Sequence, residues 1–443
     1  MSEVETSDPT ADDLPPAAEP PPLSESDAAL QRYQHRLGRR RLVYFSVIAV
    51  VLAVIGVLVG VAWVHGEVAN TTLRTVHPPP QALPVGAASP TPQQAWQTSD
   101  QVAIGTPRWQ GTIVTYSAHT VRGRDARTGA QTWYYDRSDR TVCTAIQTNG
   151  TTIAVYAHNG NCDELTAVSS ETGERRWTRT LDKDGQPVNG QPAYQVSDAT
   201  VVFSTKSVIY AIDPVTGYDR WEYTRGGCAI QHVVQGSSGV LISQDCHHVD
   251  CGSQQLCGNG PQLLMRDGGA GRNDDDDTNP DRLRWNHIGD TDIPVCADQL
   301  IAAVNTTTHA LDMLDSATGG ARGSLALNPA PAAIEPSVAA ATVSTEVIWM
   351  GGVTYAVDAT SRQLTWAVRT SAPTTVETDT EGVTASIETA RITVPGPPGI
   401  HILDGNDGHT AQRFALPVPQ ASLVYSLGSG FLVATESGTT AYR

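Results

Sequence analysis

The sequence predicts an all-β fold, an eight-bladed β-propeller of four-stranded blades closed by pairing of N- and C-terminal strands and preceded by one transmembrane helix. Two observations predict it. A pattern typified by residues 213–221 (Asp-Pro-Val-Thr-Gly-Tyr-Asp-Arg-Trp) recurs at intervals of 44, 44, 54, 48, 43 and 46 residues. An uncharged stretch of 23 residues, 42–64, precedes every copy. A repeat of this length is typical of propeller blades, each a small sheet packed on its neighbours.

Each copy of the pattern reads as a strand, a tight turn and a second strand that carries a tryptophan. We expect the Asp carboxylate to accept hydrogen bonds from nearby backbone amides, the Thr hydroxyl to add another, and the Gly to adopt the left-handed conformation. The Trp should pack flat against the neighbouring blade. The predicted motif residues are Asp125, Thr128, Gly129, Trp133, Thr172, Gly173, Trp177, Asp213, Thr216, Gly217, Trp221, Asp267, Trp285, Asp315, Thr318, Gly319, Asp358, Trp366, Asp404 and Gly408.

The eighth blade is predicted to be shared between the two ends of the chain. One more interval of 44 residues after Asp404 ends just past Arg443, so the last blade lacks its Trp strand. Residues 94–98 contain Trp96 without a preceding turn. We therefore expect the Trp96 strand to pair with the strand that ends near Tyr442, which would hide both sheet edges.

The N-terminal region is predicted to place the propeller outside a membrane. Residues 1–41 read as a disordered acidic tail that ends in a basic segment, and residues 42–64 are long enough to span a hydrocarbon core. The basic flank predicts a cytoplasmic N-terminus and a single-pass signal anchor in a bacterial cell membrane. A cleaved signal peptide is the alternative, but the apolar run exceeds a signal-peptide core. Residues 65–93 read as a Pro-rich linker, and residues 94–443 as the propeller, with an insertion near 246–282.

The charge of the chain excludes one class of partner. The formal net charge is −17, and five of the 29 basic residues lie within residues 32–41. Nucleic acid binding requires a basic face that neutralises phosphates. We therefore expect no nucleic acid partner.

All seven cysteines follow the predicted anchor, in a compartment where disulfides persist. Their equivalent positions in two blades suggest the pairs Cys143 with Cys162 and Cys228 with Cys246. Cys251 and Cys257 could close a small loop. Cys296 is then unpaired, so either it is a free thiol or this pairing scheme is wrong. Zinc at residues 246–251 and calcium at residues 273–281 are alternatives, but neither spacing matches an established ligand pattern.

The repeat Tyr-Ala-Ile-Asp-x-x-Thr-Gly-x-x-x-Trp, as in residues 210–221, resembles that of PQQ-like β-propellers. That superfamily contains quinoprotein alcohol dehydrogenases and the propeller lipoprotein of the outer-membrane β-barrel assembly machinery. The resemblance implies the fold more strongly than the function. The dehydrogenases hold their quinone beside a disulfide of adjacent cysteines and a calcium ion, whereas this chain has no adjacent cysteines.

We therefore expect a non-enzymatic scaffold without a cofactor, held in the membrane by one helix and binding a protein, most simply an envelope protein, or another envelope component. No catalytic set of residues is recognisable. The insertion near 246–282 is the predicted contact surface. A quinone-dependent oxidoreductase is the first alternative and a sensor of an external ligand the second.

Overall fold

The computed structural model divides into two units, Met1–Asn70 and Thr71–Arg443. It describes residues 44, 46–57, 67–83, 88–105, 108–158, 160–183, 186–187, 192–197, 200–248, 258–268, 283–334, 339–341, 345–371, 375–377, 391–396, 399–416, 418–419 and 422–443. The predicted disordered tail, Cys251 with Cys257, and the acidic loop 273–281 lie outside these residues.

The first unit is helical where it is described. Residue 44 and residues 46–57 form an α-helix, and α2 spans Glu67–Asn70. No helix within the described residues is long and apolar enough to cross a membrane. Part of the predicted anchor, residues 42–43, 45 and 58–64, lies outside them.

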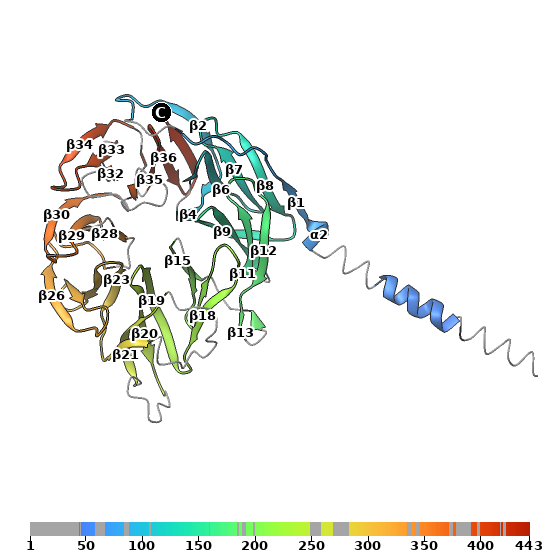
Figure 1. Cartoon of the computed structure of the whole chain (residues 1–443), viewed down its shortest axis with the longest axis horizontal. Coiled ribbons are helices and arrows are strands. Elements are labelled where there is room, and N and C mark those ends of the chain that lie inside the picture. The colour runs from blue at the N-terminus through green and yellow to red at the C-terminus, as the bar shows by residue number, and fades with distance from the viewer. Residues whose placement is uncertain are drawn as a thin grey trace, which may run out of the picture. The chain divides into compact units, whose positions relative to one another are not determined.

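The second unit is a ring of eight antiparallel blades (Figure 1), numbered here in chain order. Blades 1 to 4 each run from the innermost to the outermost strand. Blade 1 contains β3 (Gln101–Val102), β6 (Thr112–Tyr116), β7 (Thr120–Asp125) and β8 (Gln131–Arg137), and blade 2 contains β9 (Thr141–Thr148), β10 (Thr151–His158), β11 (Asn161–Ser169) and β12 (Arg175–Thr180). Blade 3 contains β15 (Ala193–Val196), β16 (Val201–Ser204), β17 (Val208–Ile212) and β18 (Asp219–Thr224). Blade 4 contains β19 (Cys228–Gly236), β20 (Gly239–Cys246), β21 (Gly260–Arg266) and β22 (Leu283–Ile288).

Blades 5 to 8 follow the same order. Blade 5 contains β23 (Ile293–Ala297), β24 (Ile301–Asn305), β25 (Ala310–Leu314) and β26 (Ala321–Ala326), and blade 6 contains β27 (Ala339–Ala341), β28 (Thr345–Met350), β29 (Val353–Asp358) and β30 (Leu364–Arg369). Blade 7 contains β31 (Thr375–Glu377), β32 (Arg391–Gly396), β33 (Gly399–Leu403) and β34 (Thr410–Phe414). Blade 8 contains β35 (Leu423–Leu427), β36 (Gly430–Thr435), β37 (Gly438–Tyr442) and β2 (Gln94–Thr98). The short strands β4 (Ile104–Gly105) and β5 (Arg108–Trp109) add to blades 2 and 1, and β13 (Asp182–Lys183) pairs with β14 (Gln186–Pro187).

The core lies between the blades. Several middle strands of the blades are short apolar runs, such as β17, all of whose residues are buried. One cluster joins Ile153 and Leu165 of blade 2 to Phe203 and Tyr210 of blade 3. Because each sheet buries its faces against its neighbours, the ring closes around a set of interblade cores.

The ring closes as the sequence predicts. In blade 8, β2 pairs antiparallel with β37, with Gln94 opposite Tyr442 and Trp96 opposite Ala441. The chain near the end of β37 and the chain before β2 are joined by two more backbone hydrogen bonds, in which the amides of Gln93 and Arg443 each donate to the carbonyl of the other at 2.5 and 2.8 Å. The C-terminus therefore lies beside β2, as Figure 1 shows.

Part of the segment predicted as a linker belongs to the propeller unit. Strand β1 (Thr71–Arg74) pairs antiparallel with β8 and becomes a fifth strand at the outer edge of blade 1. The Val76 amide then donates to the Thr172 carbonyl of blade 2 at 3.1 Å. Leu83 and Ala88 are buried among residues of the ring. The segment therefore packs along the propeller and is not a free spacer over this stretch.

Candidate functional site

The turn residues are held by local hydrogen bonds. Asp213 Oδ1 accepts from the amides of Val215 and Thr216 at 2.9 and 3.0 Å, and these bonds lower the pKa of the carboxyl group against the opposing effect of burial. Gly217 has a φ of 75° and donates its amide to the Asp213 carbonyl at 2.8 Å. Asp carboxylates accept from the corresponding two amides in the turns that begin at Asp125, Asp315 and Asp358, and from the first of them in the turn that begins at Asp404. These carboxylates are therefore committed to turn structure.

Five of the six repeat Trp residues reach the turn of the next blade. Trp177 Nε1 donates to the Pro214 carbonyl at 3.1 Å, and the ring lies so close to Gly217 that an added Cβ would come within 2.5 Å of it. The same bond, to the carbonyl one residue after the Asp position, is made by Trp96, Trp133, Trp285 and Trp366 at 3.2, 3.0, 3.2 and 2.8 Å. The Gly of each of these five turns is therefore required both by its φ and by the indole packed against it, whereas the blade 6 turn carries Arg362, with a φ of 58°, at this position.

The motif residues that the sequence singles out are not brought together. They are spread around the ring, one set for each blade, so they form a repeated interblade joint and no convergent catalytic site. Two positions lack the indole, since Gly323 of blade 5 and Gln412 of blade 7 occupy the Trp register.

The joint between blades 3 and 4 departs from the pattern. Trp221 is buried, but its Nε1 has no hydrogen-bond partner within the described chain. The guanidinium of Arg266 lies 5.8 Å from the Trp221 ring centroid and 4.7 Å from that of Tyr223. The turn that should receive the indole proton is interrupted by the predicted insertion after Asp267.

Two of the predicted disulfides are confirmed. Cys143 and Cys162 join β9 to β11 within blade 2, and Cys228 and Cys246 join β19 to β20 within blade 4. The second bridge differs from the expected equivalence, because it links directly opposite residues of neighbouring strands. Since Cys246 is oxidised, it is not a ligand in the alternative zinc site.

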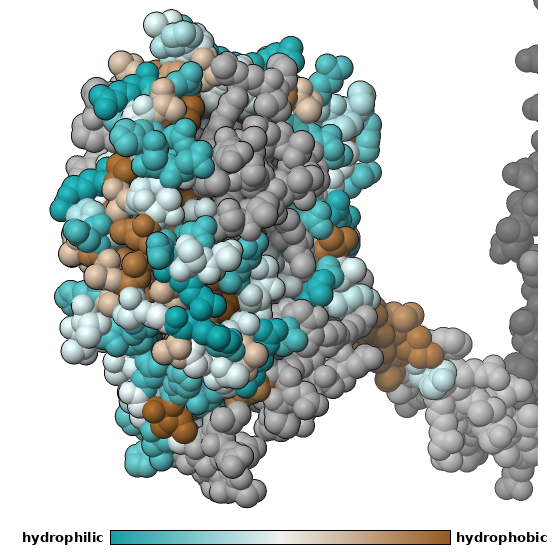
Figure 2. All heavy atoms as spheres, turned by 60° about the vertical axis from the view of Figure 1, so that its left-hand side comes forward, coloured by the Kyte–Doolittle hydropathy of each residue, from teal (hydrophilic) through white to brown (hydrophobic). Residues whose placement is uncertain are grey.

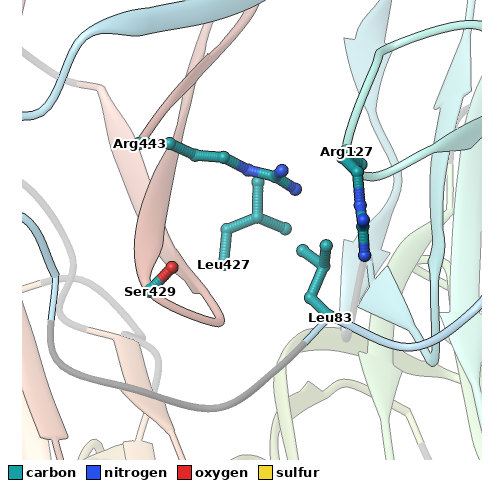
Figure 3. Close-up of a pocket in the computed structure, with 5 residues that line it drawn as sticks. All are labelled: Leu83, Arg127, Leu427, Ser429 and Arg443. Carbon is teal, nitrogen blue, oxygen red and sulfur yellow. The ribbon is translucent and has the colours of Figure 1, made fainter.

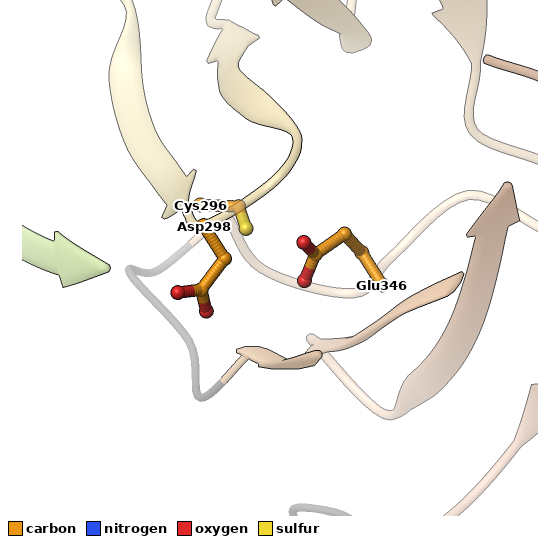
Figure 4. A group of neighbouring side chains, drawn as sticks. All are labelled: Cys296, Asp298 and Glu346. Atoms are coloured by element: carbon orange, nitrogen blue, oxygen red, sulfur yellow. The ribbon is translucent and has the colours of Figure 1, made fainter. Parts of the chain in front are cut away.

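Cys296 is a buried free thiol and lies in a small cluster with Asp298 and Glu346 (Figure 4). Their candidate ligand atoms, Sγ and a carboxylate oxygen from each acid, all lie within 4.8 Å of one another. The cluster joins blades, because Glu346 of β28 accepts from the amides of Gln299 and Leu300 after β23 at 3.1 and 3.3 Å. Asp298 Oδ1 accepts from the Ser237 amide of blade 4 at 2.6 Å.

The protonation of this cluster follows from its burial. Burial raises the pKa of Glu346 to about 7, and the charge of Asp298 adds to the effect. Burial also raises the pKa of the Cys296 thiol well above its ordinary value, so it is a poor nucleophile. We assign the cluster a structural role, because both carboxylates accept hydrogen bonds from backbone amides of neighbouring turns. Sequence reasoning missed Asp298 and Glu346: Asp298 lies two residues after Cys296, but only the ring brings Glu346 of the next blade to them.

The surface is mixed in character. Figure 2 shows brown apolar patches scattered among teal polar residues on the face it presents. The turn of blade 3 is unusual among the turns because it exposes a β-branched and an aromatic side chain, Val215 and Tyr218, at 46% and 52%. The two corresponding positions in blade 1 are Arg127 and Ala130, and in blade 2 they are Glu171 and Glu174.

Three solved structures are similar to this chain at low identity and at TM-scores below 0.5. The ring is similar to a crystal structure of BamB from Moraxella catarrhalis, with 15% identity, 80% of this chain and 100% of that chain covered, and a TM-score of 0.47. It is also similar to a quinohemoprotein alcohol dehydrogenase from Pseudomonas putida, with 12% identity, 79% and 76% coverage and a TM-score of 0.47. A computationally designed protein, Ika8, matches with 10% identity, 79% and 98% coverage and a TM-score of 0.48. Likeness at these identities says nothing about function.

Among curated proteins no sequence matches this chain. A family model does match, and its description is outer membrane protein assembly factor BamB. The match covers residues 85–322, more than half of the 443 residues, and includes the turns of the first five blades. The chain therefore belongs to the family described as outer membrane protein assembly factor BamB.

Proposed function

We propose that this chain is a membrane-anchored, extracytoplasmic scaffold that binds an envelope protein through its propeller. Family membership is the observation that carries the proposal. The arrangement of the repeat residues supports it, because their carboxylates, indoles and glycines are used within the joints between blades. A rigid ring whose polar repeat residues form hydrogen bonds within its own turns is suited to presenting a surface to a partner.

The location is proposed from the N-terminal sequence and the disulfides. Residues 42–64 carry no charge and follow a basic segment, a pattern that favours a cytoplasmic N-terminus. Disulfides such as Cys143–Cys162 persist in oxidising compartments outside the cytoplasm. We expect the full chain to remain in membranes after alkaline carbonate washing, and externally added protease to degrade the propeller of intact spheroplasts. Release by carbonate, or full protection from protease, would refute this location.

The turn of blade 3 is our proposed part of the contact surface among the described residues. Tyr218 is 52% exposed and Val215 is 46% exposed, and their amides donate to the Thr216 hydroxyl and the Asp213 carboxylate of the same turn. Aromatic side chains that are exposed in this way are enriched at protein interfaces. The insertion near 246–282, most of which lies outside the described residues, remains the other proposed part.

A photo-crosslinking amino acid at position 218 of the full chain tests this proposal in cells. The matched control is position 369, which is also exposed, at the end of the outer strand of blade 6. We expect a discrete crosslinked protein at position 218 and none at position 369. Identical products from both positions would show non-specific proximity and contradict a contact surface at this turn.

A separate measurement distinguishes a scaffold from an oxidoreductase. The full chain is incubated with pyrroloquinoline quinone and calcium, and reduction of an artificial dye by primary alcohols is followed. Turnover that depends on both additions would overturn the scaffold proposal.

A further inference from the structure

At the closure seam, where blade 8 meets blade 1, a basic residue occupies the turn position that is acidic in most other blades. In every blade the Trp register lies opposite the residue two positions before the turn's first residue, as Trp133 lies opposite Gly123 and Trp221 opposite Ala211. In blade 8, Trp96 lies opposite Ala441, so the first position of the turn is Arg443. The other seven blades place six aspartates and one serine there.

The Arg443 backbone reproduces the hydrogen bond of an ordinary turn. In blade 1 the Asp125 amide donates to the carbonyl of Ala130, three residues before Trp133, at 2.8 Å. In blade 8 the Arg443 amide donates to the carbonyl of Gln93, three residues before Trp96, at the same distance. Arg443 therefore matches Asp125 both in its register and in its backbone hydrogen bond.

The Arg443 side chain extends to the next blade. Its Nη2 donates to the Ala126 carbonyl at 2.9 Å, the same carbonyl that receives the Trp96 indole proton. Arg127, the next residue in that turn, therefore brings a second guanidinium close to the first.

A cavity of about 240 Å³ lies between these two guanidinium groups. Leu83, Arg127, Leu427, Ser429 and Arg443 line it. In Figure 3 the arginines enter from opposite sides, the two leucines form the wall between them, and the Ser429 hydroxyl lies on the blade 8 side. The residues come from three separate parts of the chain that meet only when the ring is closed.

Within the described residues no ion pair joins either Arg127 or Arg443 to a carboxylate within 4.0 Å. Burial lowers the pKa of Arg443, the positive charge of Arg127 lowers it further, and Asp125 opposes both effects. Asp125 Oδ1 already accepts from the Arg127 and Thr128 amides and the Thr128 hydroxyl.

We propose that this cavity binds a small organic anion, a carboxylate or phosphate monoester that carries a short apolar group. Guanidinium groups hold the oxygens of such anions by charge-assisted, often bidentate hydrogen bonds. The Ser429 hydroxyl supplies a further donor, and Leu83 with Leu427 supplies contact for the apolar group. The volume is below the 300 Å³ or so of typical ligand pockets, which limits the ligand to a few carbons. Because the ligand joins Arg127 of blade 1 to Arg443 of blade 8, it stabilises the closed ring.

Calorimetric titration and thermal melting of the full chain in a mild non-ionic detergent test the proposal. The probes are n-butyl phosphate, butyrate, inorganic phosphate and 1-butanol at constant ionic strength. We expect one butyl phosphate or butyrate site per chain, a higher Tm in its presence, weaker binding of inorganic phosphate and none of 1-butanol. Inorganic phosphate that binds as tightly as butyl phosphate would overturn the assignment of an organic ligand.

Arg127→Gln is the decisive variant, because its exposed side chain can change without loss of a described contact. We expect at least tenfold weaker binding, with the Tm of the ligand-free chain unchanged. Arg369→Gln removes an exposed positive charge from blade 6 and should bind as the parent does. Equal binding by Arg127→Gln and the parent, or no binding of any anion at millimolar concentration, would refute the site.

Discussion

Replacement of Trp133 and Trp221 by Phe measures what the indole hydrogen bond contributes to a blade joint. Both rings are buried, at 0% and 3% exposure. Trp133 Nε1 donates to the Ser170 carbonyl at 3.0 Å, whereas Trp221 Nε1 has no partner within the described residues. The two positions therefore differ in the hydrogen bond much more than in their burial.

The expected magnitude follows from this difference. At both sites the smaller ring loses packing, which typically costs about 1–3 kcal/mol for partial truncation of a buried side chain. At position 133 the change also removes a hydrogen bond and leaves the Ser170 carbonyl without its indole donor, about 1–3 kcal/mol more. At position 221 it removes a buried donor that has no acceptor among the described residues. The phenyl ring of the Trp221→Phe variant would keep most of the attraction to Arg266, since that interaction is with the ring face. We expect Trp133→Phe to destabilise the chain by about 1–3 kcal/mol more than Trp221→Phe.

Equilibrium urea unfolding of the full chain, followed by circular dichroism, provides the comparison. Equal slopes against urea for the parent and both variants would show that unfolding is comparable. Equal destabilisation at the two positions, or a larger effect at 221, would refute the role given to the indole hydrogen bond.

Four further predictions concern the joints and the braces. Trp177→Ala should cost about 3–5 kcal/mol, and unchanged melting would contradict its docking role. Gly217→Ala should cost about 1–3 kcal/mol by urea unfolding, because its φ is 75° and its Cβ would meet the Trp177 ring. The pKa of Glu346 is raised to about 7, so the folded chain binds a proton that the unfolded chain has lost, and its free energy of unfolding should fall by up to about 3 kcal/mol as pH rises from 4.5 to above 7. Glu346→Gln, whose side-chain oxygen can still accept from the backbone amides, should lose this dependence of stability on pH. An unchanged pH dependence in that variant would contradict the assignment. Replacement of Cys143 and Cys162 by Ser should cost about 2–4 kcal/mol in oxidised material and nothing under reducing conditions, as thermal melts would reveal.

The ring was predictable because its joints are local and repeated. A turn that begins at Asp213, contains Gly217 and leads to Trp221 has its own hydrogen-bond chemistry, so it can be recognised without knowledge of distant contacts. The closure followed from the same register, which left the final blade without a Trp strand and Trp96 without a turn. Both inferences depend on spacing alone, and spacing is what a sequence records directly.

Features that depend on contacts between distant segments could not be predicted. Residues 71–74 have no strand pattern of their own and pair with blade 1 because its outer edge is available. Glu346 approaches Cys296 and Asp298 only because blades 5 and 6 meet there, and Asp298 also accepts from an amide of blade 4. The two disulfides likewise occupy similar sequence positions but connect different strands, since blade 4 brings Cys246 directly opposite Cys228.

Two of the joints that depart from the repeat leave donors or positive charge without a counterpart among the described residues. Between blades 3 and 4, Trp221 keeps a proton that no described acceptor receives, beside a turn that is interrupted after Asp267. Between blades 8 and 1, Arg443 replaces the expected acid and faces Arg127 across a cavity. Intact joints satisfy their own polar groups and offer little to a ligand, whereas these two retain unused donors or positive charge. Binding is therefore most strongly expected at joints where the repeat fails, and the seam is the one whose described residues already define the chemistry of a ligand.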